Sequence, residues 1–249
     1  MIYYKTFGNP QNKALLLGSS LGTSSNMWNN VVEDLAAKYF VVAFDTRGHG
    51  QSQTLGLEPL SVEQFAQDVI EVADHLNIAT FIYAGLSLGG AIGQMLAITY
   101  PERVERLILC CTAAKFGEPA FWQERAALVQ QNGMASILEA TKGRWYNPGT
   151  AESNAFAQTL LDELLTFNPK GYANTCLAVG AFDVRDRLGQ ITCPTLVIAG
   201  TEDLSTPVSV MQVVANGIPN ATLVAVQGAA HLGNVEKPQE FTRAILNFA

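Results

Sequence analysis

The stretch YAGLSLGG, residues 83–90, is the most informative part of this sequence. It places Ser87 between Gly85 and Gly89 in a G-x-S-x-G pattern, after an apolar run and before a helical pattern. A serine on a tight strand-to-helix turn needs neighbours with almost no side chain, because the two backbones come close together. Such a turn lifts the hydroxyl above the sheet and presents the N–H of Leu88 to an anion. The stretch therefore predicts a nucleophile and one half of an oxyanion site.

The same pattern would also fit a plain helix N-cap with close packing, so its surroundings matter. Residues 81–84 form a short apolar run typical of a buried strand. Residues 88–100 carry apolar side chains at helical spacing until Pro101 ends the pattern. This strand–turn–helix setting favours the nucleophile interpretation.

Composition limits the classes of function. The chain has 249 residues, of which 48% are hydrophobic, and a formal net charge of −7. This length fits one α/β domain, and because no basic patch stands out we expect no nucleic-acid or membrane partner. The four cysteines include no C-x-x-C pair and the three histidines lack metal-ligand spacing, so we expect no metal and no cofactor. Without a leader-like N-terminus or a run of about eighteen apolar residues, we expect a soluble cytoplasmic protein.

Strand and helix patterns alternate along most of the chain. The apolar runs expected to be strands cover residues 2–7, 14–17, 40–44, 81–84, 104–111, 194–200 and 221–226. Helical patterns between them include residues 30–38 and 61–76, the second with Ser61 as N-cap and Gln64 at the capping-box position. This alternation predicts an α/β fold with a mostly parallel, doubly wound sheet.

The alternation breaks between residues 114 and 187, where no strand pattern appears. Helical patterns cover residues 121–131, 151–167 and 172–182. Such an insertion is typical of a lid over a crevice, and we expect it after the sixth strand. The expected organisation is a core of residues 1–113 and 188–249 with a helical lid of residues 114–187.

A serine nucleophile needs a base within hydrogen-bond reach, and the base needs an acid to orient it. Of the three histidines, His231 lies on a loop after a predicted strand, whereas His49 lies in a glycine turn and His75 in a helix. Asp203 follows the preceding strand, which gives the chain order Ser, Asp, His expected on this sheet, and Glu202 is its competitor. We therefore predict His231 as the base and Asp203 as the acid that orients it.

Two further loops follow predicted strands. Loop 18–22 can offer the N–H of Leu21 as a second oxyanion donor, although an ordinary polar turn fits it equally well. The segment DTRGHGQS, residues 45–52, contains Asp45 and Arg47. We interpret it mainly as a turn held by its glycines and an Asp–Arg contact.

The chain resembles an α/β-hydrolase over its whole length, and several stretches are similar to one family, the 3-oxoadipate enol-lactonases of the β-ketoadipate pathway of aromatic compound degradation. These stretches are residues 18–23 with Met27 and Trp28, residues 45–50, residues 230–236, and the lid segments 171–173 and 183–188. Many α/β-hydrolases carry His-Gly where this chain has Ser19-Ser20, but the enol-lactonase pattern also lacks that histidine.

The resemblance implies hydrolysis of a small anionic lactone, 3-oxoadipate enol-lactone (4,5-dihydro-5-oxofuran-2-acetate), to 3-oxoadipate. Ser87 would attack the ring carbonyl while His231, oriented by Asp203, takes its proton. The N–H groups of Leu21 and Leu88 would bind the oxyanion.

An anionic substrate needs a local cation, because a net charge of −7 does not attract it. Our candidate is Arg144, with Arg125 and Lys142 as alternatives, although an ordinary surface charge on a helix fits the pattern equally well. Trp122 and Trp145 are candidate walls of the substrate site, and lid packing is the other interpretation of both.

Other functions fit the same residues. They would serve a carboxylesterase or a carbon–carbon bond hydrolase, and a hydrolase fold can also persist as a catalytically inert ligand-binding module. A dehalogenase would require Asp in place of Ser87. Because a binding module has no need for a complete triad, a serine hydrolase is the prediction, and fold analogy alone selects no substrate.

Overall fold

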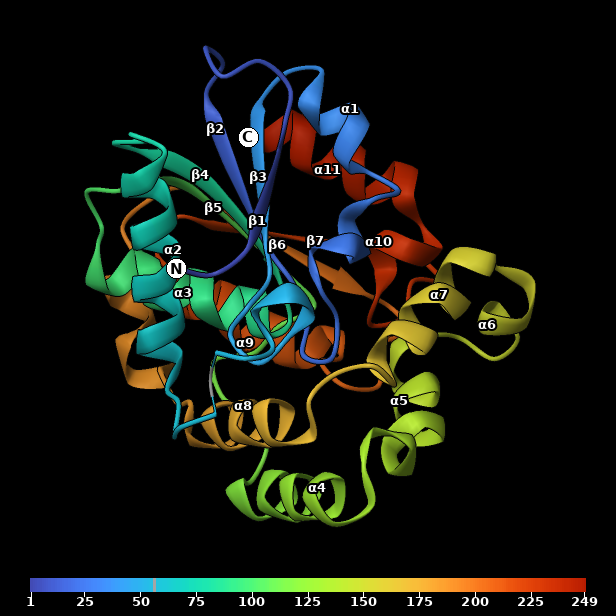
Figure 1. Cartoon of the computed structure of the whole chain (residues 1–249). Coiled ribbons are helices and arrows are strands. Elements are labelled where there is room, and N and C mark those ends of the chain that lie inside the picture. The colour runs from blue at the N-terminus through green and yellow to red at the C-terminus, as the bar shows by residue number, and fades with distance from the viewer. Residues whose placement is uncertain (56) are drawn as a thin grey trace.

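A computed structural model describes residues 1–55 and 57–249, and a seven-stranded sheet runs through its centre (Figure 1). The strands are β1 (Tyr4–Phe7), β2 (Ala14–Gly18), β3 (Phe40–Phe44), β4 (Phe81–Leu86), β5 (Val104–Cys110), β6 (Thr195–Gly200) and β7 (Ala221–Val226). Their order across the sheet is β1-β3-β2-β4-β5-β6-β7. The pair β1–β3 is antiparallel and the other described pairs are parallel, which confirms the expected fold class.

Helices cover both faces of the sheet because the central strands are apolar on both sides. Leu15 and Leu17 of β2 pack in one core with α1 (Val32–Ala36) and α11 (Pro238–Phe248). Leu16 points to the other face and packs with α2 (Val62–His75), α3 (Leu88–Thr99) and α9 (Val208–Gly217). Alternate residues of a strand point to opposite faces, so one continuous apolar run supplies both cores.

The order of the strands reverses next to β2. The chain passes from β2 to β3 on one side of β2 and returns to β4 on the other. In open parallel sheets, ligands bind outside the carboxyl ends of the strands at such a switch point. The loop after β2 carries Leu21 and the turn after β4 carries Ser87, so both lie at this point.

Between β5 and β6 the chain forms α4 (Pro119–Asn132), α5 (Leu138–Trp145), α6 (Thr150–Ser153), α7 (Ala155–Leu164) and α8 (Pro169–Ala181), the green-to-gold group in Figure 1. The expected helix 151–167 is two helices, because the Asn154 side chain accepts the N–H groups of Phe156 and Ala157 and starts a new one. Helix α5 was not expected. The division into a core and a lid of residues 114–187 stays a prediction.

The insertion follows the fifth strand of the described chain, and its expected place after the sixth strand is wrong. Only five of the apolar runs predicted as strands precede residue 114, and each of them forms one strand, so a count of these runs also gives the fifth strand. The remaining elements are the short α10 (Gly233–Glu236) and the 3₁₀ turns Ser25–Trp28, Gly50–Ser52, Met134–Ile137 and Arg185–Gln190.

Among the described residues no helix has the length and apolar character needed to cross a membrane.

Two local expectations have different outcomes. Ser61 is confirmed as the N-cap of α2, since its Oγ accepts the N–H of Gln64 at 3.3 Å. The expected contact between Asp45 and Arg47 does not form. The guanidinium of Arg47 instead binds both carboxylate oxygens of Asp68 on α2, at 2.6 and 2.7 Å. The Asp45 carboxylate is already occupied, because it accepts two backbone N–H groups.

The burial of His49, in the same turn, leads us to expect that the fold loses stability in acid. Its ring is buried against Phe167 and Tyr172, and burial lowers the pKa of His49 to about 4. Because the unfolded histidine binds its proton near pH ~6.5, lowering the pH from about 7 to about 4.5 favours the unfolded chain by about 2 kcal/mol through this group. We expect His49→Gln to flatten the dependence of the unfolding free energy on pH in this range.

Urea denaturation at several pH values measures the slope of the unfolding free energy against pH. His75→Gln, which removes an exposed histidine from α2, is the control. A His49→Gln slope equal to that of the parent protein would contradict the prediction.

Candidate active site

Ser87 occupies a strained turn between β4 and α3. Its backbone has φ 58° and ψ −113°, and a positive φ is uncommon for a residue with a side chain. A Cβ added to Gly85 would lie 2.1 Å from the carbonyl oxygen of Gly89, and one added to Gly89 would lie 2.2 Å from that of Gly18. The two glycines are therefore required by backbone contacts, as the motif predicts.

His231 and Asp203 form a buried pair. His231 Nδ1 lies 2.9 Å from Asp203 Oδ2, and the two residues are 5% and 2% exposed. The other bonds of the carboxylate come from the next turn, because Oδ1 accepts the N–H groups of Ser205 and Thr206 and Oδ2 accepts the Thr206 hydroxyl. This Asx turn fixes the direction of the carboxylate.

The environment keeps the Asp203 carboxylate ionised. Burial alone would raise the pKa of this group, but the charge of His231 and the hydrogen bonds from His231 and Thr206 hold the pKa well below its usual range. An ionised carboxylate facing Nδ1 favours the tautomer with the proton on Nδ1, which leaves Nε2 free to accept a proton. The competitor Glu202 is instead hydrogen-bonded to the Thr201 hydroxyl.

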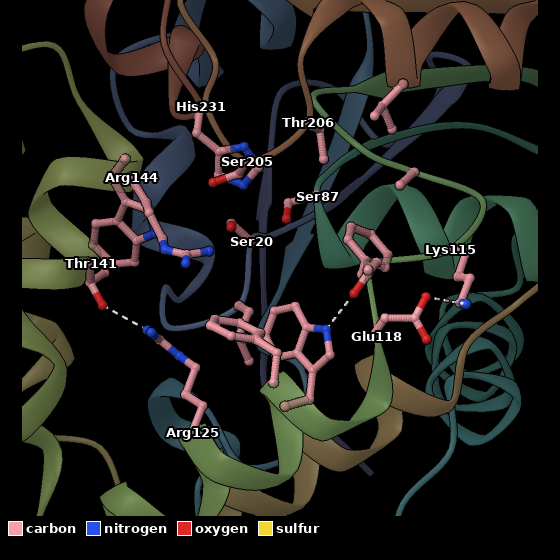
Figure 2. A pocket seen from close by; sticks show the side chains of 18 of the residues that line it. Ser20, Ser87, Lys115, Glu118, Arg125, Thr141, Arg144, Ser205, Thr206 and His231 are labelled. Carbon is pink, nitrogen blue, oxygen red and sulfur yellow. Dashed lines mark hydrogen bonds and ion pairs between the residues drawn. The ribbon is translucent and has the colours of Figure 1, made fainter.

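A cavity of about 360 Å³ lies beside these groups. Figure 2 shows Ser87, His231 and Ser20 facing it. Of the predicted site residues, those that line it are Ser87, His231, Leu21, Arg144, Trp122 and Trp145. Asp203 lies behind His231, and Leu88 lies outside the lining. The structure thus gathers residues from the loops after β2 and β4, the inserted helices and the loop after β7.

Two backbone N–H groups near Ser87 are free. Within residues 1–55 and 57–249, the N–H groups of Leu21 and Leu88 have no hydrogen-bond partner. Leu21 follows Ser20 in a turn closed by the bond from Thr23 N–H to the Ser20 carbonyl at 3.1 Å, with Gly22 at φ 84°. The N–H of the first central residue of such a turn takes no part in the closing bond, so Leu21 can donate to a ligand.

Two arginines reach the cavity from the inserted helices (Figure 2). Arg144 of α5 lies over the ring of Phe121 at 4.7 Å, and Arg125 of α4 donates to the hydroxyl groups of Tyr172 and Thr141 at 2.9 and 2.7 Å. Neither arginine forms an ion pair with a carboxylate in the described part of the chain. Burial and the charge of Arg125 lower the pKa of Arg144, so a bound anion would relieve their repulsion.

The third candidate cation, Lys142, has another role. It forms an ion pair with Glu152 on α6 and does not line this cavity.

The described residues contain no group of three or more His, Cys, Asp or Glu side chains arranged to hold a metal ion.

Sequence reasoning missed several groups around the site. Ser205 and Thr206 bind the carboxylate of Asp203, and an Asp followed within three residues by Ser and Thr is a recognisable Asx-turn signal. Tyr172 lines the cavity and holds Arg125, at a separation of 47 residues in sequence. No local pattern could have predicted that contact.

Comparison with known proteins agrees with this architecture. The model of the alpha/beta hydrolase fold family matches residues 13–238. The chain is 41% identical over 243 residues to 3-oxoadipate enol-lactonase 2 of Acinetobacter baylyi, covering 97% of this chain and 90% of that protein.

Solved structures give the same result. An enol-lactonase from Burkholderia xenovorans superposes with a TM-score of 0.96 at 34% identity, covering 99% of this chain and 95% of the other. A hydrolase from Pseudomonas aeruginosa superposes with a TM-score of 0.95 at 37% identity, covering 98% and 92%. The chain therefore belongs to the α/β-hydrolase superfamily and, within it, to the family of the 3-oxoadipate enol-lactonases.

Proposed function

We propose that this hydrolase opens 3-oxoadipate enol-lactone to 3-oxoadipate, as a serine esterase of the β-ketoadipate pathway. One observation carries the proposal. A single cavity is lined by a strained serine and by the histidine of a His–Asp pair, together with two arginines that form no ion pair with a carboxylate in the described part of the chain. This combination suits a substrate that has both an ester bond and a carboxylate. The name of the relative from Acinetobacter baylyi supports the same substrate.

The proposed chemistry is that of a serine nucleophile with a histidine base and an acid that orients the base. Ser87 Oγ attacks the ring carbonyl carbon while His231 Nε2 takes the hydroxyl proton. The bond from that carbon to the ring oxygen then breaks, and the proton returns to the expelled oxygen, which is an enol. A water molecule activated by His231 attacks the acyl-enzyme and releases the acid. Asp203 keeps its position and its charge throughout.

Reclosure of the ring competes with the second half of the reaction. The expelled oxygen remains attached to the acyl chain, so it stays close to the ester of Ser87. Conversion of the enol to the ketone removes this nucleophile and makes ring opening irreversible. The N–H groups of Leu21 and Leu88 are proposed to bind the oxyanion of both tetrahedral intermediates, each contributing about 3 kcal/mol to transition-state stabilisation.

The Arg144 guanidinium is proposed to bind the substrate carboxylate. We expect Arg144→Gln to raise the KM for the anionic lactone by about tenfold or more, because a charge-assisted hydrogen bond contributes roughly 1.5–3 kcal/mol. Hydrolysis of a neutral ester such as 4-nitrophenyl acetate should change little. Steady-state kinetics with both substrates measure the two effects.

Two variants complete this test. Lys142→Gln removes a cation that lies outside the cavity and should leave both KM values at the parental level. Arg125→Gln tests the second arginine in the same way. An unchanged KM for the lactone in Arg144→Gln would contradict the assignment of the carboxylate site.

Carboxylesterase activity is the second candidate. The observation in its favour is the apolar wall formed by Phe116, Phe121, Trp122 and Trp145, which also suits a neutral aryl ester. The candidates are distinguished by comparing kcat/KM for three substrates: the enol-lactone, the neutral ester 4-nitrophenyl acetate, and a product of aromatic ring cleavage, which is the substrate of a carbon–carbon bond hydrolase. The largest value for the lactone is the result that we predict, and a far larger value for the neutral ester would assign an esterase.

A catalytically inert binding module is the non-enzymatic alternative. Covalent labelling of Ser87 by an organophosphate, detected by mass spectrometry, would argue against such a module because the labelling reaction requires an activated serine.

The four cysteines of the described chain are free thiols, which is typical of a reducing compartment. The proposal accordingly places the reaction in the cytoplasm.

A further inference from the structure

The peptide group between Ser87 and Leu88 links the nucleophile to the oxyanion site. In a planar trans peptide, the carbonyl and the N–H point in opposite directions. Any group that holds the Ser87 carbonyl therefore also aims the Leu88 N–H. This carbonyl accepts two hydrogen bonds, from the Thr112 hydroxyl at 2.7 Å and from the N–H of Ala91 at 3.0 Å.

The conformation of Ser87 makes such an anchor necessary. The left-handed minimum lies near φ ~57° and ψ ~47°, whereas Ser87 is held at ψ −113°. A residue in this region stores strain, and relaxation of ψ at Ser87 would rotate the peptide plane and turn the Leu88 N–H away. The bond from Ala91 belongs to the first turn of α3 and moves with it. Thr112 follows β5, so its bond is an anchor independent of that helix.

Thr112 is itself held firmly. Its side chain is completely buried, and its N–H donates to the Met211 sulfur at 3.0 Å. The preceding residue, Cys111, adopts φ 43° and donates its N–H to the Ile198 carbonyl at 2.8 Å, which fixes the turn after β5. A Cβ added to Gly90 would lie 2.6 Å from Cβ of Thr112, so the start of α3 rests directly on this side chain.

We propose that Thr112 is a positioning residue for the oxyanion site. Its hydroxyl holds the Ser87 carbonyl and thereby aims the Leu88 N–H at the oxygen of the tetrahedral intermediate. Thr112 lies outside the cavity and touches no substrate. The inference rests on the proposed function, because it assumes that Ser87 attacks an ester, but it does not depend on which ester is the natural substrate.

Thr112→Val tests the role of the hydroxyl because valine keeps nearly the same shape. We expect the kcat for 4-nitrophenyl acetate to fall by about tenfold or more while KM stays within about twofold, since the oxyanion exists only after attack. The inhibition constant of phenylboronic acid, which forms a tetrahedral adduct with an active serine, should rise by a similar factor. A purely structural role would not produce this pattern.

A second pair of variants keeps the test decisive if Thr112→Val folds poorly. Thr112→Ser and Thr112→Ala both lack the threonine methyl group and differ from each other by the hydroxyl. We expect Thr112→Ser to retain a kcat within about threefold of the parent value and Thr112→Ala to behave like Thr112→Val. Circular dichroism and melting temperatures of all variants establish that each is folded at the assay temperature.

The outcomes separate this inference from the proposed function. If the folded Thr112→Val and Thr112→Ala variants lose thermal stability but keep the parental kcat and boronate affinity, the positioning role is overturned while the proposed function stands. If the parent protein neither hydrolyses any of the esters nor binds the boronate, the proposed function fails and the inference fails with it. A loss of kcat in the valine and alanine variants that serine restores supports the positioning role.

Discussion

Replacing Asp203 with asparagine is expected to lower the kcat for ester hydrolysis by about 10⁴-fold, because the histidine would then adopt the wrong tautomer. Both carboxylate oxygens of Asp203 face hydrogen-bond donors. Oδ1 accepts hydrogen bonds from the backbone N–H groups of Ser205 and Thr206. A backbone N–H can only donate, so the atom that faces these two groups must be an acceptor. The amide oxygen of the substituted side chain must therefore take that side, which leaves its NH₂ group facing the imidazole of His231.

An NH₂ group facing Nδ1 favours the tautomer with the proton on Nε2. That nitrogen is then a donor and cannot accept the proton of Ser87. We expect KM to change much less than kcat, because Asp203 does not line the cavity. Steady-state kinetics with the lactone and with 4-nitrophenyl acetate measure the loss.

Glu202→Gln is the matched control for this prediction. Glu202 is the neighbouring acid, but it is hydrogen-bonded to the hydroxyl of Thr201 and not to His231. Its substitution should leave kcat close to the parental value. Equal losses in Asp203→Asn and Glu202→Gln, or a parental rate in Asp203→Asn, would refute the assignment of Asp203.

Adding one methyl group to Gly85 is expected to damage both the fold and the activity. In Gly85→Ala the new Cβ would lie 2.1 Å from the carbonyl oxygen of Gly89 and 2.7 Å from the backbone nitrogen of Gly90. Backbone atoms cannot move aside as a flexible side chain can, so we expect the free energy of unfolding to fall by about 3 kcal/mol or more. Displacement of the turn should also remove most of the activity, because the turn carries Ser87.

Gly143→Ala is the control for the same chemical change. Gly143 lies in α5, and a Cβ added there would meet no atom within 4 Å. The substitution should raise the free energy of unfolding by about 0.5–1 kcal/mol, because alanine is a better helix former than glycine. Urea denaturation measures both variants. A Gly85→Ala variant as stable and active as Gly143→Ala would contradict the expected clash between the new Cβ and the backbone of the turn.

The elements predicted well from sequence are those with strong local patterns. The buried strands are continuous apolar runs, and Ser61, as an N-cap residue, indicates where α2 begins. Helix α5 was missed because four of the eight residues in its sequence, LEATKGRW, are polar and a fifth is Gly143. The insertion was placed one strand too late, although the five apolar runs before residue 114 correspond one to one with β1 to β5.

The candidate site shows the same division between local and distant information. The G-x-S-x-G motif and the order of Ser, Asp and His along the chain predict which residues should meet. The same sequence does not predict that Arg47 pairs with Asp68 or that the Thr112 hydroxyl binds the Ser87 carbonyl. Those contacts join residues 21 and 25 positions apart. The packing of α2 brings Asp68 to Arg47, and the pairing of β4 with β5 brings Thr112 to Ser87.

The most direct test uses freshly prepared 3-oxoadipate enol-lactone, purified parent protein and the Ser87→Ala variant, with the loss of the ultraviolet absorbance of the lactone as the signal. We predict rapid loss with the parent and a rate at least about 10⁴-fold lower with Ser87→Ala, because the variant lacks the attacking oxygen. Circular dichroism shows whether the variant is folded. A lactone that persists in the presence of the parent protein, or that disappears equally fast with folded Ser87→Ala, would contradict the proposal that Ser87 opens this lactone.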